Sequence, residues 1–230
     1  MKKSNIITLV MFFFLIPITL YLGLIINKRS YYIIGVIIIA ELLIPLLLTF
    51  EKKKPQAKEL VIIAVMCSLA IVGRIAIPIP HFKATYGIIM LTGISLGPEV
   101  GFMVGVVTAF VSNFFYGQGP YMPWQMLAYG AGGMLAGFAF MSKRISRKPV
   151  FLAIFGFLAT VFFVGPLLDT AHVFLMMPQV NIEYVTASLI SGFPVNISQG
   201  ICTSITMGLF GKPLFEKLDR IKLKYGMLED

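Results

Sequence analysis

Charged residues are scarce in this sequence: they make up 13% of its 230 residues, whereas 58% are hydrophobic. A soluble domain normally carries about 25% charged residues, because its surface must be hydrated. A chain with so little charge cannot cover itself with a polar surface, and most of it must therefore face lipid. The composition predicts an all-α polytopic membrane protein, built as one compact helical bundle.

Cysteine is also rare, and the sequence contains no nucleotide-binding motif. The two cysteines, Cys67 and Cys202, each lie within an apolar stretch, which excludes a disulfide scaffold and predicts no metal site. No His-Glu-x-x-His motif supplies zinc ligands. The segment Gly208 to Lys212 has the wrong spacing for a phosphate-binding loop and is followed by Pro213. Any ATP that this protein uses must be hydrolysed by a partner, and no cofactor is expected.

Long apolar runs are what the sequence has instead, and each is a candidate transmembrane helix. The first is too long for a signal-peptide core and lacks a small-x-small cleavage site. The run at 86–96 is short, and Gly97-Pro98 after it indicates a turn. Eight helices are predicted, at 6–26, 31–50, 60–79, 86–96, 100–116, 124–141, 150–168 and 184–210.

The distribution of the basic residues predicts how the chain is oriented in the membrane. With the N-terminus placed in the cytoplasm, fifteen of the 19 Lys and Arg residues fall on that side, three fall outside, and Arg74 lies within a helix. This asymmetry predicts a multi-pass protein of the cell membrane with both termini cytoplasmic. The basic residues are not interleaved with aromatics in one patch, which argues against nucleic-acid binding despite the net charge of +9.

The external connections hold most of the polar and aromatic residues that could recognise a ligand. Around the turn at 117–123, amides alternate with rings, and such side chains hydrogen-bond and stack on flat molecules. Tyr and Trp also form belts at any membrane surface, which is the competing interpretation. Amides at membrane depth need partners, which favours binding. The candidates here are Asn113, Tyr116, Gln118, Tyr121, Trp124 and Gln125.

Two further polar pairs follow along the chain. Asp169 and His172 share a helix face if the seventh helix continues through them, and they either bind substrate or pair with each other. Asn196 and Gln199 follow a predicted break at 192–194, and interrupted membrane helices line cavities. All four are predicted substrate-binding residues.

Arg74 is the one strong charge in an apolar segment beside a predicted external loop. An intramembrane Arg marks a functional site by default, but snorkelling to the interface explains it equally well. Pairs of small residues spaced by four allow helices to approach closely. The pairs Gly101/Gly105 and Gly133/Gly137 are expected to pack within the bundle, whereas Ala64/Ser68 is predicted to contact a partner protein.

From about residue 58 onward the chain resembles the substrate-binding S components of energy-coupling factor (ECF) vitamin importers. The resemblance rests on four stretches: Gly117-Gln118-Gly119-Pro120 with Pro123-Trp124-Gln125-Met126, the glycine-rich segment 130–137, Leu168-Asp169, and Gly192-Phe193-Pro194-Val195-Asn196. It implies a six-helix substrate-binding domain at 58–230, preceded by two extra transmembrane helices within 1–57. It also implies capture of a vitamin from outside and docking on a transmembrane coupling subunit driven by two ATPases.

In this family an Ala-x-x-x-Ala pattern contacts the coupling subunit, and Ala64-x-x-x-Ser68 stands in its place. The segment around Gln118 and Trp124 looks most like the cobalamin-type S components, so cobalamin or a related corrinoid is the expected substrate, with riboflavin or another vitamin as the alternative. Two other classes stay open: an intramembrane enzyme using Asp169 and His172 as acid and base, and a secondary transporter with inverted repeats. No nucleophile or metal set supports the enzyme, and the two halves show no convincing similarity.

Overall fold

A computed structural model describes residues 57–142, 145–177 and 181–225, together with isolated positions before residue 57. The two predicted N-terminal helices, at 6–26 and 31–50, lie outside the described residues apart from a few such positions. One contact there joins the two runs, because Thr19 Oγ1 donates a hydrogen bond of 2.5 Å to Glu41 Oε1.

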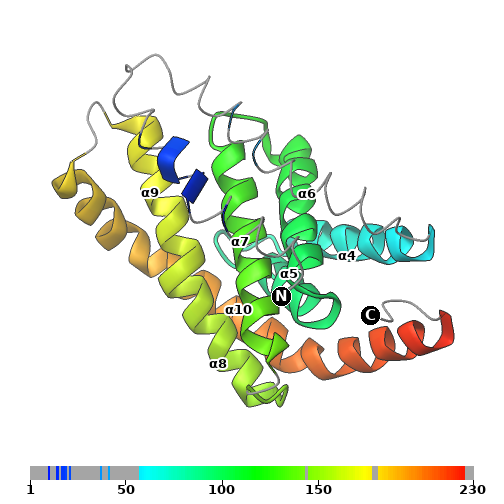
Figure 1. Cartoon of the computed structure of the whole chain (residues 1–230). Helices are drawn as coiled ribbons and strands as arrows, with labels where there is room; N and C mark the ends of the chain where they lie inside the picture. The colour runs from blue at the N-terminus through cyan, green and yellow to red at the C-terminus, as the bar shows by residue number, and fades with distance from the viewer. Residues whose placement is uncertain are drawn as a thin grey trace.

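Within the described ranges every regular element is helical, and helices occupy the predicted apolar runs (Figure 1). The predictions at 60–79, 86–96, 100–116 and 124–141 correspond to α4 to α7, with ends shifted by at most four residues. The elements are α4 (Ala57–Ile75), α5 (Thr85–Leu96), α6 (Pro98–Tyr116), α7 (Met122–Met141), α8 (Pro149–Ala159), the π-helical turn η2 (Thr160–Val164), α9 (Gly165–Met176) and α10 (Ile182–Tyr225).

The seventh predicted helix is longer than expected. Elements α8, η2 and α9 form one continuous helix from Pro149 to Met176, seen in Figure 1 as a single rod that changes from lime to yellow. Proline lacks the N–H that an α-helix needs, and π-helical turns commonly absorb such a defect. The turn η2 directly precedes Gly165 and Pro166. The helix therefore carries Asp169 and His172, which the sequence had placed at its end.

The predicted break at 192–194 is wrong. Helix α10 runs for 44 residues through Pro194 and Pro213, well beyond the predicted end at 210. Proline is tolerated inside membrane helices when neighbouring helices and hydroxyl side chains satisfy the freed backbone groups. Figure 1 shows α10 continuing from its gold N-terminal end to its red C-terminal end.

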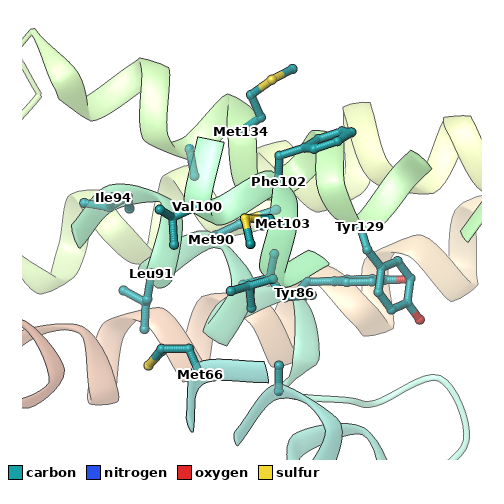
Figure 2. Close-up of a cluster of buried hydrophobic side chains, with 14 of the residues drawn as sticks. Met66, Tyr86, Met90, Leu91, Ile94, Val100, Phe102, Met103, Tyr129 and Met134 are labelled. Atoms are coloured by element: carbon teal, nitrogen blue, oxygen red, sulfur yellow. The ribbon is translucent and has the colours of Figure 1, made fainter. Parts of the chain in front are cut away.

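Glycines bring α5, α6 and α7 into backbone contact at the centre of the fold. A Cβ atom on Gly101 would lie 2.6 Å from Gly93 Cα, and one on Gly133 would lie 2.6 Å from Gly101 C. No side chain fits such gaps, so the prediction that these glycines pack within the bundle is confirmed. Around them lies the apolar core, part of which Figure 2 shows.

The two ends of this core differ in chemistry. Figure 2 shows Ile94 at one end of the cluster and Tyr129 at the other. At the Ile94 end, Arg147 Nη2 donates to Ile94 O at 3.2 Å and Lys222 Nζ donates to Ser95 O. Cations at the C-terminal carbonyls of a helix complement its dipole. Burial lowers the pKa of the Lys222 amine, and nearby Asp219 opposes that shift.

The outward side of the bundle is apolar. Among the described residues, Pro98–Tyr116 and Pro149–Met176 are long and apolar enough to cross a membrane. Large hydrophobic side chains are exposed along α4, α8 and α10, and a soluble monomer rarely exposes so many. They include Val61, Val65, Leu69, Ile154, Leu158, Phe162, Ile190, Ile205 and Leu209. This surface suits contact with lipid.

Candidate binding cavity

A cavity of about 520 Å³ opens at the end of the bundle opposite Arg147 and Lys222. It lies among the loop after α4, the start of α5, the C-terminal end of α6 and the N-terminal half of α7. Its other side is formed by η2, the N-terminal half of α9 and the N-terminal half of α10. Ligand pockets for small molecules are commonly about 300–1,000 Å³ and carry a few polar groups on an otherwise apolar wall. The polar residues in this wall are Arg74, His81, Lys83, Tyr86, Tyr116, Gln125, Tyr129, Thr160, Asp169, Asn196 and Gln199.

Arg74 is the centre of one wall. Its side chain is 9% exposed, and Nη1 donates to Ser112 Oγ and, at 2.9 Å, to Asn113 Oδ1. Nη2 lies 3.5 Å from Gln125 Oε1, which also accepts a hydrogen bond of 2.8 Å from Asn113 Nδ2. These contacts turn the guanidinium inward and tie α4 to α6 and α7. Snorkelling, the alternative interpretation of Arg74, is therefore excluded.

Tyrosine rings surround this guanidinium. Arg74 Cζ lies 4.9 Å from the ring centre of Tyr116 and 5.5 Å from that of Tyr129, within the range of cation–π attraction. The Tyr116 hydroxyl donates to Arg74 O at 2.8 Å. Tyr86 packs edge-on against Tyr129, with ring centres 4.9 Å apart. Two of these rings, Tyr86 and Tyr129, are also visible in Figure 2 at the cavity end of the core.

The opposite wall holds a carboxylate that is fixed by an amide. Asn196 Nδ2 donates to Asp169 Oδ2 at 2.6 Å, which links α10 to α9. Two glycines make room for this pair. A Cβ on Gly192 would lie 2.5 Å from Asp169 Oδ2, and a Cβ on Gly165 would lie 2.6 Å from Asn196 Nδ2. Each glycine thus faces the polar side chain of the other helix.

Two polar atoms in the wall have no hydrogen-bond partner within the described part of the chain. They are Gln199 Oε1 and Thr160 Oγ1, both shielded from solvent. A buried polar atom without a partner costs about 1–3 kcal/mol, so such atoms call for an explanation. Both residues line the cavity.

The structure brings together half of the predicted site. Tyr116, Gln125, Asp169, Asn196 and Gln199 all line the cavity, although they come from four different helices. Asn113 is fully buried one layer behind the wall, where its amide holds Arg74 and Gln125 in place.

Like Asn113, the other four predicted residues do not line the cavity. Trp124 is 8% exposed and packs against Phe174, with ring centres 5.1 Å apart, while the next residue, Gln125, reaches the cavity. Gln118 is exposed and donates to Phe110 O, and Tyr121 donates to Gly117 O within the loop. His172 is exposed, and among the described residues no hydrogen bond or ion pair joins it to Asp169, whose carboxylate accepts from Asn196.

Several residues of the wall belong to none of the patterns from which the site is predicted. Lys83, Tyr86, Tyr129 and Thr160 all line the cavity. The available signal was a polar residue inside an apolar run, which holds for Thr160 and Tyr129. His81, in the loop after α4, also reaches the wall and has a positive φ of 55°.

The predicted partner contact lies elsewhere, on α4. Ala64 and Ser68 are both exposed, and the Ser68 hydroxyl is turned back onto Ala64 O at 2.9 Å, which leaves a shallow surface. Beside them a second cavity of about 440 Å³ is lined mainly by apolar side chains of α4 and of the C-terminal part of α10, including Val61, Val65 and Leu218.

Comparisons with known proteins agree with the predicted class. Residues 54–216 match the family described as ECF-type riboflavin transporter, S component. A UPF0397 protein of Clostridium perfringens is 23% identical over 189 residues, which cover 77% of this chain and 97% of that protein. A UPF0397 protein of Aliivibrio salmonicida is 33% identical over 96 residues, covering 39% of this chain and 52% of that protein. No solved structure matches the chain significantly.

Proposed function

This chain belongs to the family of ECF-type riboflavin transporter S components, and on that premise we propose that it captures a vitamin in the cavity around Arg74 and delivers it through a coupling subunit. It is a membrane protein and a substrate-specific subunit of an ECF transporter, and the family is one of transporters rather than enzymes. The single observation that supports the proposed site is the cavity wall, where Gln199 Oε1 and Thr160 Oγ1 lack partners in the described residues.

The proposed topology places the cavity outside. The basic end of the bundle, with Arg147 and Lys222, faces the cytoplasm by the distribution of Lys and Arg, so the cavity faces the external medium. Both termini are cytoplasmic in this proposal, and the protein crosses the cell membrane several times. Ligand enters near the loop after α4, where Pro78, Pro80 and His81 form part of the wall.

The volume of the cavity bears on the identity of the vitamin. About 520 Å³ suits a molecule of flavin size, whereas a corrinoid is much larger and needs the loop after α4 to move aside. The tyrosines of the wall offer ring faces and edges to a flat ligand. We therefore propose a flavin-sized vitamin. The corrinoid expected from the sequence stays a prediction, and the family match gives it no support.

Coupling is proposed to occur on α4. Helices in lipid associate by close backbone approach, and Ala64 with Ser68 leaves the exposed surface of α4 shallow. The apolar cavity beside them, lined by Val61 and Val65, can receive a side chain of the coupling subunit. ATP is hydrolysed by two ATPase subunits of the partner module, and the vitamin is cargo rather than a cofactor.

Titration of the purified full chain in detergent tests the proposal. Riboflavin, cobalamin, folate and pantothenate are each added in a calorimeter, and uptake of the tightest binder is then measured in vesicles with and without the ATPase and coupling subunits. We expect saturable binding of one vitamin and uptake only with the complete module. Uptake by this chain alone would instead identify a secondary transporter, and binding of none of the four would remove the proposed function.

A further inference from the structure

Two cations approach the same ring in the cavity wall. Arg74 Cζ lies 4.9 Å from the ring centre of Tyr116, and Lys83 Nζ lies 6.0 Å from it. The two residues come from different segments, since Arg74 lies in the last turn of α4 and Lys83 lies in the loop that follows. Positive charge is thus gathered on one side of a cavity that is partly closed to water.

The guanidinium has only neutral partners. Its described hydrogen-bond partners are a hydroxyl and two amides, from Ser112, Asn113 and Gln125, and no carboxylate of the described residues forms an ion pair with it. Arginine stays charged at any physiological pH, and a buried charge without a counter-charge is strongly disfavoured. In a membrane the cost is greater, so an intramembrane cation of this kind points to a functional role.

Donors also remain available for a ligand. Both N–H groups of Nη1 are used by Ser112 and Asn113, whereas Nη2 makes one long contact with Gln125, so part of the five-donor fork has no described partner. Lys83 Nζ makes one described contact, to Ile77 O, out of the three that an ammonium group can donate.

The carboxylate already present in the wall does not neutralise these cations. Asp169 accepts its hydrogen bond from Asn196, and within the described residues it forms no ion pair with Arg74 or Lys83. The cavity therefore has two cations on one wall, and on the other wall a carboxylate that is hydrogen-bonded to Asn196. An anion entering the site would meet both cations and complete the pairing that the protein leaves open.

We propose that the substrate carries an anionic group, a carboxylate or a phosphate, which binds between Arg74 and Lys83 beside the Tyr116 ring. This inference rests on the proposed function, because it concerns the ligand of the same cavity. Such a substrate differs in charge from a neutral vitamin such as riboflavin itself. Arg74 and Lys83 then determine which substrates bind.

Pairs of probes that differ in one anionic group test the inference. The purified full chain is titrated with riboflavin and riboflavin 5′-phosphate, and with panthenol and pantothenate. In at least one pair the anionic member should bind about 10- to 100-fold more tightly, as expected for charge-assisted hydrogen bonds. Lys83→Met and Arg74→Gln should each reduce this preference, whereas Lys212→Met, on an exposed lysine, should not.

The outcomes separate the inference from the proposed function. If in every pair that binds the neutral member binds as tightly as the anionic one, or if Lys83→Met weakens both equally, the inference is overturned while the capture function stands. If Arg74→Gln does not fold, Lys83→Met decides, because Lys83 lies in a loop and is only partly buried. If no member of either pair binds, the proposed function fails and the inference fails with it.

Discussion

Gly192→Ala is the change for which the structure gives the most definite expectation. A Cβ at this position would lie 2.5 Å from Asp169 Oδ2, closer than real Cβ atoms approach. The carboxylate must then rotate away, and it loses the 2.6 Å hydrogen bond from Asn196 Nδ2. The substitution therefore acts on the cavity wall through one contact between α9 and α10.

The magnitude follows from two opposing effects. A hydrogen bond to a charged group contributes about 1.5–3 kcal/mol. Replacing glycine by alanine inside a helix gains roughly 0.5–1 kcal/mol. The net loss of stability is thus about 1–2 kcal/mol. For a chain of this size each kcal/mol lowers the midpoint of thermal unfolding by about 2–4 °C, so a decrease of about 2–8 °C is expected.

A control on the same helix isolates the contact. Gly208 also lies in α10, but its Cβ would meet Ala153 Cβ at 3.4 Å, which is ordinary van der Waals distance. Gly208→Ala should leave the unfolding midpoint unchanged or raise it slightly. Both variants are compared with the wild type by thermal unfolding in the same detergent.

A double substitution identifies the cause. In an Asp169→Ala background the carboxylate is gone, so adding Gly192→Ala should cost little, and the two effects should be clearly non-additive. Equal costs of Gly192→Ala with and without Asp169 would refute the reasoning. So would a Gly192→Ala protein as stable as Gly208→Ala.

Three further changes test other parts of the structure. Ser68→Trp should block the coupling subunit and lower vitamin uptake several-fold, while ligand affinity is unchanged. As a control, Ile154→Trp, on the exposed side of α8, should change neither the uptake nor the affinity. Gly97→Ala should lower the free energy of unfolding by about 1–3 kcal/mol, measured by denaturant titration, because a φ of 102° is strained for alanine. Asn113→Leu removes the acceptor from Arg74 and should cost about 1–3 kcal/mol in the same assay; an unchanged stability would show that the network is dispensable.

The apolar runs predicted where the helices lie but not how far they continue. The sequence placed a break at 192–194 because local rules treat Gly and Pro as helix breakers. In the structure the helix passes through Pro194, and Gly192 instead provides space for Asp169 of the neighbouring helix. A close approach between two helices has no signature in the local pattern, since it depends on which residues face each other across the bundle.

The candidate site was predictable only in part, for a similar reason. Amides in apolar segments signalled Gln125, Asn196 and Gln199 correctly as cavity residues. Trp124 was selected for its residue type, yet it points toward Phe174, because consecutive residues on a helix face different directions. Arg74 could be flagged as unusual, but its partners lie at least 38 residues further along the chain and emerge only from the packing.

The most direct test of the central claim compares two Gln→Ala variants for vitamin binding. Gln199 Oε1 lies in the cavity wall without a described partner, whereas Gln118 is exposed in the loop outside it. If the vitamin binds in this cavity, Gln199→Ala should weaken its affinity about tenfold, the equivalent of 1.4 kcal/mol, and Gln118→Ala should leave it unchanged. Loss of affinity in Gln118→Ala but not in Gln199→Ala would place the ligand in the outer loop and contradict the account.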